Sequence, residues 1–301
     1  MKIDKLNGNV AFNEEKHKYF NVDDPSKEYI SVTTLIHRFT QPFDKDFWSA
    51  YKALEKLLPK ESWAIEKKSL LNSKKFNKSI LEVYNISELE FNKAQQDILD
   101  AWDEKNRLAC ERGTAIHAEI ENSFYKKKSN ITLDKFGIGG KFECKKDYSE
   151  LDLDYGVYPE YLIYRESDDG ILKIAGQIDL IIKMGNEIIL VDHKTNEKID
   201  QKSGFDTKTK QPATMLYPLN NLPDCNFYHY SLQLSTYAWM LQKLNPNFII
   251  KDLILNHYDH NGNNVIYHCD YLKDDVERML LFYKKELIKD KQKARRKPIE
   301  Y

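Results

Sequence analysis

The segment GQIDLIIKMGNEIILVDHKTN (residues 176–196) constrains the fold more than any other part of the sequence. Its two apolar runs are separated by Gly185 and Asn186, a pair that suits the positive φ angles of a two-residue β-hairpin turn. With these as the turn residues, the register places Asp179 directly opposite Asp192, with Cβ atoms about 4.5–5.5 Å apart. Because both strands are apolar on both faces, the sequence predicts a buried, central strand pair.

Three charged groups are expected on one face of this hairpin. Two aspartates that face each other destabilise a strand pair, so a divalent cation is the expected compensation. Lys194 lies two residues after Asp192, on the same face, where an ammonium group can orient a metal-bound water and stabilise charge on a phosphate. The His193 side chain points the other way, but its backbone carbonyl can reach the metal. The alternative is an exposed hairpin with solvated charges, and the apolar strands favour the functional interpretation.

The remaining sequence predicts a helical N-terminal part followed by an α/β core. Residues 10–31 indicate short strands around a polar turn, and residues 33–127 have helical periodicity with a break or bend expected near Gly113. The polar segment 126–150 is expected to be a loop. Later runs predict strands over 157–165, 171–184, 187–194, 251–259 and 264–271, a hairpin turn at Asn261-Gly262, and helices over 229–244 and from Asp274.

Composition excludes several classes of protein. The mean hydropathy of the 301 residues is −0.66 and no apolar run approaches the roughly 18 residues of a membrane span, so no transmembrane helix is expected. The first residues lack the apolar stretch of a secretory signal. The four cysteines form no Cys-x-x-Cys pair, which disfavours a disulfide scaffold, a zinc ribbon or a cysteine-ligated cluster. We therefore expect a protein of the reducing cytoplasm.

Charge is balanced over the chain but uneven along it. The 46 basic and 47 acidic residues give a net charge of −1, so no global positive field indicates a nucleic-acid-binding protein. Residues 284–297, with eight Lys/Arg against two acids, and the lysine-rich loop 198–210 are locally basic. Such segments predict contact with phosphates along a limited track. The alternative is a solvated helix end and a solvated loop.

Four motifs in one order resemble the PD-(D/E)xK nuclease superfamily, in particular its RecB-type exonuclease branch. Gly-x-Ile-Asp, a short hairpin and a strand ending in Asp-x-Lys-Thr lie at residues 176–195. Upstream, RGTAIH (residues 112–117) is similar to the Gly-Thr-x-x-His helix, whose histidine is a metal ligand in that branch. Downstream, Gln233 and Tyr237 are similar to its Gln-x-x-x-Tyr helix motif, and Glu160 matches the glutamate of its first core strand.

The resemblance implies a fold and an activity. YISVTTLI (residues 29–36) is also similar to the phage-type and mitochondrial-genome-maintenance exonucleases of this branch. The implied fold is α/β, a restriction-endonuclease-like core with a mixed sheet of about five strands flanked by helices. Residues 1–109 would form N-terminal strands and a helical cap, and residues 110–301 the nuclease core with a basic C-terminal helix. The implied activity is hydrolysis of DNA, single-stranded and with a free end, in recombination, repair or replication.

The resemblance also implies cofactors and individual roles. One or two Mg²⁺ or Mn²⁺ ions would be held by His117, Asp179, Asp192 and the His193 carbonyl. Lys194 would position the attacking water, with Asp179, Asp192 and Glu160 as further catalytic residues. Because no C-terminal cysteine triplet is present, no iron–sulfur cluster is expected. No membrane partner is expected. Substrate contacts are implied for four residues: Gln233, Tyr237, Arg112 and Thr195.

Each of these assignments has an alternative. Taken alone, His117 suits packing beside its apolar neighbours on a helix, and Tyr237 suits a helical core position. Gln233 and Tyr237 share one helix face because they are four residues apart. For the whole chain, the alternatives are a site-acting endonuclease of the same fold or a non-catalytic nucleic-acid-binding module. The intact Asp, Asp, Lys and His set favours an enzyme.

Overall fold

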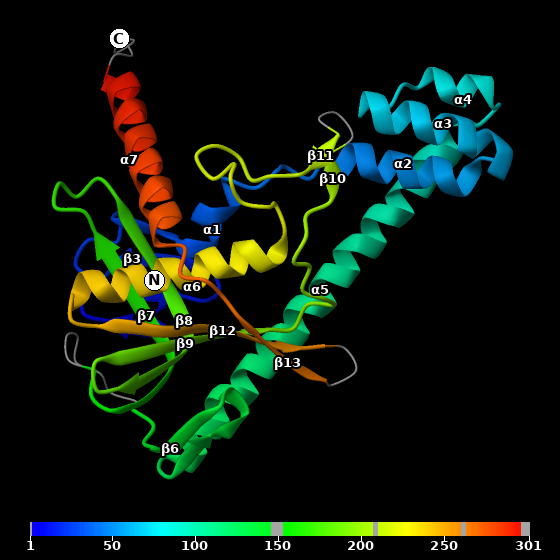
Figure 1. Ribbon diagram of the computed structural model, residues 1–301. Helices are drawn as coiled ribbons and strands as arrows, with labels where there is room; N and C mark the ends of the chain where they lie inside the picture. Colours follow the sequence, from blue (N-terminus) through cyan, green and yellow to red (C-terminus); the bar gives the residue numbers. More distant parts are fainter. Residues whose placement is uncertain (1, 146–152, 207–209, 260–262, 296–301) are drawn as a thin grey trace. The chain divides into compact units, whose positions relative to one another are not determined.

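The computed structural model describes residues 2–145, 153–206, 210–259 and 263–295 (Figure 1). The chain divides into two compact units that interleave along the sequence. The sheet unit comprises Met1–Thr40, Ala115–Ser203 and Thr214–Tyr301. The helical unit comprises Gln41–Thr114 and Gly204–Ala213.

One large mixed sheet organises the sheet unit. Its order is β1-β2-β3-β4-β8-β9-β12-β13, and β7 also pairs with β8. Two contacts are parallel, β4 with β8 and β9 with β12, and the others are antiparallel. The bounds are β1 (Lys5–Asn7), β2 (Val10–Asn13), β3 (Lys18–Asn21), β4 (Glu28–Ser31), β7 (Gly156–Glu166), β8 (Lys173–Met184), β9 (Glu187–Lys194), β12 (Ile249–Tyr258) and β13 (Asn264–His268).

The expectation of about five strands was wrong, since nine strands form this sheet within the described residues. The five core strands are present, but β1 to β4 extend the sheet because β4 pairs with β8 through Ile30–Ile174 and Ser31–Ala175. The sequence pattern indicates short strands but does not show which distant strand they will pair with. Pairing uses backbone groups, which are the same in every residue, so a partner far away in the sequence leaves no local pattern.

The central hairpin has the predicted register. Gly185 takes a φ of +58° in the turn, and β8 pairs with β9 from Met184–Glu187 to Leu180–Val191. β9 is also paired on its other edge with β12, so the hairpin is central in the sheet as its apolar composition predicted.

Helices and small strands cover the sheet in two cores. The first core contains α1 (Val32–His37), α6 (Asn226–Leu244) and α7 (Lys273–Arg295), and Figure 1 shows α6 running along the sheet. The second core contains Phe124 of α5 (Glu88–Lys127) and residues of β5 (Ile131–Leu133) and β6 (Ile138–Phe142). Each large apolar side chain buried in these cores contributes about 1.5–3 kcal/mol.

Three expectations for the middle of the chain need correction or lie outside the structure. Segment 126–150 is not only a loop, because β5, a 3-10 turn (Asp134–Phe136) and β6 lie within it, while residues 146–150 are outside the described residues. Gly113 does not break the helix, since α5 is continuous over 40 residues. The predicted turn at Asn261-Gly262 also lies outside the described residues.

The helical unit has its own core. It contains α2 (Lys45–Leu57), α3 (Lys60–Ser73), α4 (Ser79–Val83) and the first part of α5, with the short strands β10 (Phe205–Asp206) and β11 (Gln211–Pro212). Asp44 caps α2 as its position predicted, because its carboxylate accepts a hydrogen bond from Phe47 N–H. None of the seven α-helices in the described residues is long and apolar enough to cross a membrane.

Candidate metal centre

The strands β8 and β9 separate where the predicted acidic residues begin. Their last backbone pair is Leu180–Val191, after which β9 continues beside β12, with Leu255 opposite Asp192. The His193 N–H therefore does not pair with β8 and instead donates to Asp179 Oδ2 at 2.6 Å. The Asp179 carboxylate thus occupies the fork between the two strands.

Side chains of β7 and β8 alternate between the two faces of the sheet, but this alternation is interrupted in both strands between the pairs Tyr158–Ile181 and Tyr161–Ile178. Tyr158 and Tyr161, three residues apart, both pack in the first core, and their partners Ile181 and Ile178 do the same. Strict alternation would place residues three apart on opposite faces. Glu160 lies within this slip and has a φ of +52°, in the left-handed region that side chains rarely adopt. Such strain costs about 1–3 kcal/mol, persists only where the surroundings impose it, and concentrates at functional sites.

His117 of α5 brings an imidazole to these two acids. Its Nδ1 lies 3.5 Å from Glu160 Oε1 and 3.6 Å from Asp179 Oδ2. One potential ligand atom from each of the three residues lies within 4.8 Å of the others, and we call these three residues the ligand group. His117 Nε2 lies 3.0 Å from the His193 carbonyl oxygen. A carbonyl only accepts, so a neutral His117 carries its proton on Nε2 and presents the Nδ1 lone pair to the acids.

Asp192 and Lys194 form an ion pair beside the ligand group rather than within it. The predicted ligands were His117, Asp179, Asp192 and the His193 carbonyl, and the compact group contains His117 and Asp179 together with Glu160, which was predicted as a catalytic residue. Asp192 is 2% exposed, and its Oδ2 lies 2.6 Å from Lys194 Nζ. This contact lacks hydrogen-bond geometry, so Asp192 Oδ2 is a buried oxygen without a hydrogen-bond partner among the described residues.

Burial and charge act together on the titrating groups. Burial and the nearby Asp192 charge raise the pKa of Asp179 to about 7. Burial lowers the pKa of His117, but the charges of Asp179 and Glu160 outweigh it and raise the pKa to about 9. Burial likewise opposes the charged form of Lys194, but Asp192 and Asp179 raise its pKa. The site therefore combines buried carboxylates with two cations, His117 and Lys194, whose charged forms those carboxylates stabilise.

The donor set fits a hard divalent cation. One imidazole nitrogen and two carboxylates converge, and the charge of the buried Asp192 carboxylate acts on both His117 and Asp179. Oxygen-rich sets of this kind, with a single imidazole, suit Mg²⁺ or Mn²⁺ better than the soft metals that prefer thiolates. The residues present are therefore compatible with such an ion.

The helix α6 supports the lysine through a short polar chain. Lys194 Nζ donates to Gln233 Oε1 at 3.3 Å, and Gln233 Nε2 donates to the Tyr237 hydroxyl at 3.3 Å. Tyr237 is buried against Gly176 of β8, where a Cβ would lie 2.6 Å from its ring. The structure thus brings Gln233 and Tyr237 to the predicted site, and the glycine of Gly-x-Ile-Asp permits the close approach of the tyrosine.

Two further residues, Arg112 and Thr195, are predicted to bind substrate. Arg112 lies on α5 among the residues of the helical unit, and Thr195 follows β9 as a half-buried residue. Their roles remain predictions. In the locally basic segments, Lys284 pairs with Asp169 at 2.7 Å, and residues 207–209 lie outside the described residues.

Sequence reasoning missed two N-terminal residues near the site. Lys5 of β1 lies 2.9 Å from Glu160 Oε2. Tyr19 of β3 is buried, and burial together with the charges of Glu160 and Asp179 raises its pKa. No local signal distinguishes Lys5 from the chain's other lysines, since only the pairing of β1 and the packing of β7 bring it to Glu160.

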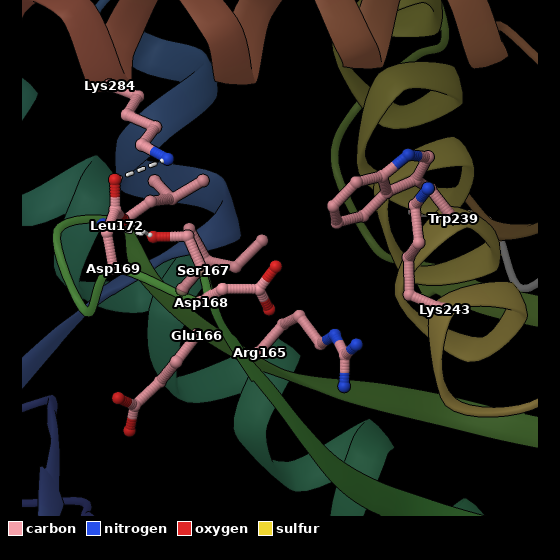
Figure 2. Close-up of a pocket in the computed structure, with 10 residues that line it drawn as sticks. Arg165, Glu166, Ser167, Asp168, Asp169, Leu172, Trp239, Lys243 and Lys284 are labelled. Atoms are coloured by element: carbon pink, nitrogen blue, oxygen red, sulfur yellow. Dashed lines mark hydrogen bonds and ion pairs between the residues drawn. The ribbon is translucent and has the colours of Figure 1, made fainter.

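A separate cavity of about 360 Å³ lies at the other end of β7 and β8 (Figure 2). Basic and acidic side chains both line it, and several of them are paired with each other or with neighbours. Lys284 Nζ pairs with Asp169 there, and Lys243 lies over the Trp239 ring. Glu166 pairs with Lys27 at 2.8 Å. We call this the distal pocket.

Comparisons with known proteins find only distant structural similarity. No protein-family model matches the chain, and no curated protein matches it. The crystal structure of SSO0001 is 19% identical over 48% of this chain, with a TM-score of 0.26, and the match spans about half (53%) of that chain. The crystal structure of a "putative exonuclease" from Eubacterium rectale is 11% identical and covers 88% of this chain and 81% of that chain, with a TM-score of 0.34. Neither similarity determines an activity.

Proposed function

We propose that this protein is a metal-dependent deoxyribonuclease that degrades single-stranded DNA from a free end. One observation carries the proposal: a buried ligand group of His117, Glu160 and Asp179 lies beside the buried Asp192–Lys194 pair. Burial of charged groups is costly in a fold, so their concentration here favours a functional role.

The ligand group, with Asp192, would hold Mg²⁺ or Mn²⁺. When bound, the ion supplies Lewis acidity for a phosphate oxygen and lowers the pKa of a bound water. His117 presents Nδ1, because its Nε2 proton is donated to the His193 carbonyl. Asp179 is held in place by the His193 N–H.

Lys194 provides a positive charge that its neighbours hold in place. Asp192 and Gln233 hold its ammonium group at 2.6 Å and 3.3 Å, and the Tyr230 ring lies 4.4 Å from it. Held in this way, Lys194 would position the attacking water and donate to the phosphate oxygen that gains negative charge. Removing a positioned donor of this type lowers turnover by about 10²–10³-fold in enzymes.

Recognition of DNA would involve residues of α6 and the two locally basic segments. Gln233 and Tyr237 would orient the nucleotide, and the basic segments 198–210 and 284–297 would contact backbone phosphates. Tyrosines, 19 in the chain, offer stacking surfaces for unpaired bases. The preference for single strands with a free end follows from the resemblance to RecB-type exonucleases.

The test uses end-labelled single-stranded DNA in linear form and as a closed circle of the same sequence. With Mn²⁺ or Mg²⁺, the linear strand should be degraded to short products while the circle survives. EDTA should abolish both binding of the ion and cleavage.

Other outcomes would overturn parts of the proposal. Cleavage of the circles would identify an endonuclease of the same site. Binding of DNA without cleavage under any metal condition would identify a non-catalytic nucleic-acid-binding module, and cleavage in EDTA would exclude the metal centre.

A further inference from the structure

Lys5 extends from the N-terminal strand β1 to the ligand group. Its Nζ lies 2.9 Å from Glu160 Oε2, across 155 residues of sequence, and 3.9 Å from Glu121 Oε1. The Lys5 and Glu160 side chains are 30% and 13% exposed, so this ion pair is largely shielded from water. Such pairs are stronger than exposed ones because water screens them less.

The two oxygens of the Glu160 carboxylate have different partners. Oε1 faces His117 Nδ1 at 3.5 Å, and Oε2 accepts the hydrogen bond from Lys5. Lys5 therefore engages the oxygen that is directed away from the imidazole. The oxygen on the side of the ligand group is left free for an ion.

The backbone of Glu160 gives a reason why an external restraint is needed. Its positive φ of +52° is unfavourable for a side-chain-bearing residue, so packing and pairing must hold it. β1 is attached next to it, because Asn7 Nδ2 donates to the Leu162 carbonyl at 2.7 Å. Lys5 thus acts from a strand that is itself fixed to β7.

We propose that Lys5 is a positioning residue of the metal centre, which holds Glu160 Oε2 so that Oε1 is directed at the ion. This inference depends on the metal site of the proposed function. Carboxylate ligands are commonly oriented by a second hydrogen bond, and loss of that partner typically weakens metal affinity by 10–100-fold.

The sign of the effect separates positioning from simple charge neutralisation. If Lys5 only neutralised Glu160 in the metal-free protein, its removal would take away a competing positive charge, and the ion would bind more tightly. If Lys5 orients Glu160, removal leaves a misdirected ligand and the ion binds more weakly.

The experiment measures Mn²⁺ affinity of the full-length protein by isothermal titration calorimetry, in the absence of DNA. Lys5→Met should weaken Mn²⁺ binding by about 10–100-fold. Lys27→Met is the matched control. Lys27 pairs at 2.8 Å with Glu166, which lies on the same strand as Glu160, and the Lys27 side chain is 31% exposed. Its Mn²⁺ affinity should equal that of the wild type.

Lys5→Arg tests geometry separately from folding. A guanidinium group can still donate to Glu160 Oε2, so this variant should recover most of the affinity lost in Lys5→Met. Circular dichroism and melting temperature establish that each variant is folded. A folded Lys5→Met with unchanged or tighter Mn²⁺ binding would overturn the inference, as would a loss of equal size in Lys27→Met.

The outcome for Lys5 and the outcome for the proposed function are distinguishable. Wild-type protein that binds Mn²⁺ but cleaves no DNA would contradict the nuclease while the Lys5 comparison still stands. Wild-type protein that binds no Mn²⁺ would overturn both.

Discussion

Glu160 and Glu166 lie on the same strand, β7, and each pairs with a lysine from the N-terminal strands and turns. Lys5 and Lys27, their partners, are almost equally exposed, at 30% and 31%. Glu160 is 13% exposed and strained at a φ of +52°, while Glu166 is 27% exposed and lies outside the left-handed region. The same pair of residue types therefore occurs in two different physical settings.

The surroundings of the two glutamates explain their different roles. Glu160 faces a second carboxylate, Asp179, whose pKa is raised by burial and by the Asp192 charge. Glu166 lies at the distal pocket, where neighbouring acids and bases balance, as with Asp169 and Lys284 (Figure 2). A candidate site is thus distinguished by buried, converging charges and strained backbone rather than by the mere presence of acids and bases.

The largest expected difference between the two regions is in cleavage rate. Lys194→Met removes the ammonium group held by Asp192 and Gln233, and the rate of release of labelled nucleotides should fall by about 10²–10³-fold. Lys27→Met, in the ion pair with Glu166, should leave the rate unchanged. Equal rates for wild type and Lys194→Met, with contaminating nuclease excluded, would remove the lysine from the mechanism.

A second expected difference is in the pH dependence of stability without metal. The pKa of Asp179 is raised to about 7 in the folded protein, above its unfolded value. Its stabilising contribution is therefore complete below about pH 4 and is lost as the pH rises through 7. Asp179→Asn, whose amide oxygen can still accept from the His193 N–H, should be more stable than wild type above pH 7 in EDTA.

The distal pocket should show the opposite dependence. Hydrogen bonds from Lys284 and Ser167 lower the pKa of Asp169, so its contribution is present above its unfolded pKa and is lost as the pH falls. Urea unfolding in EDTA between pH 3 and pH 9 gives the free energy of unfolding of the wild type and of the two variants, Asp179→Asn and Asp169→Asn. If the two variants changed the pH profile in the same direction, the contrast between the regions would be wrong.

The smallest expected difference concerns two glycines of the β7–β8 hairpin. In Gly176→Ala the new Cβ would lie 2.6 Å from the Tyr237 ring, so we expect a loss of about 1–3 kcal/mol in the free energy of unfolding. The displaced Tyr237 should also disturb Gln233 and lower the cleavage rate. Gly170→Ala meets no atom within 4 Å but has a φ of +64°, so it should cost about 1 kcal/mol without a change in rate.

Urea unfolding and the nucleotide-release assay check both glycine variants. A Gly176→Ala protein with wild-type stability and rate would show that Tyr237 can move without consequence. The polar chain from Tyr237 through Gln233 to Lys194 would then have no positioning role.

The sequence by itself determined the features that depend on local geometry. The turn at Gly185-Asn186 fixed the register of β8 and β9, because a two-residue hairpin leaves only one pairing that buries the apolar side chains. Strand alternation brought Lys194 to the side of Asp192, where they form an ion pair. The four-residue spacing of Gln233 and Tyr237 placed them on one helix face, where they are hydrogen-bonded.

Only the tertiary structure decided which distant residues complete the centre. His117 arrives from a helix, Glu160 from a strand whose alternation slips, and Lys5 from a three-residue strand 155 positions away. Motifs in the sequence had singled out His117 and Glu160, but no local signal marked Lys5. The slip in alternation and the left-handed φ of Glu160 could not be read from the sequence either, because they arise from packing against neighbouring strands. The sequence determined the backbone pairing of its central hairpin, and long-range packing determined which charges are buried together beside it.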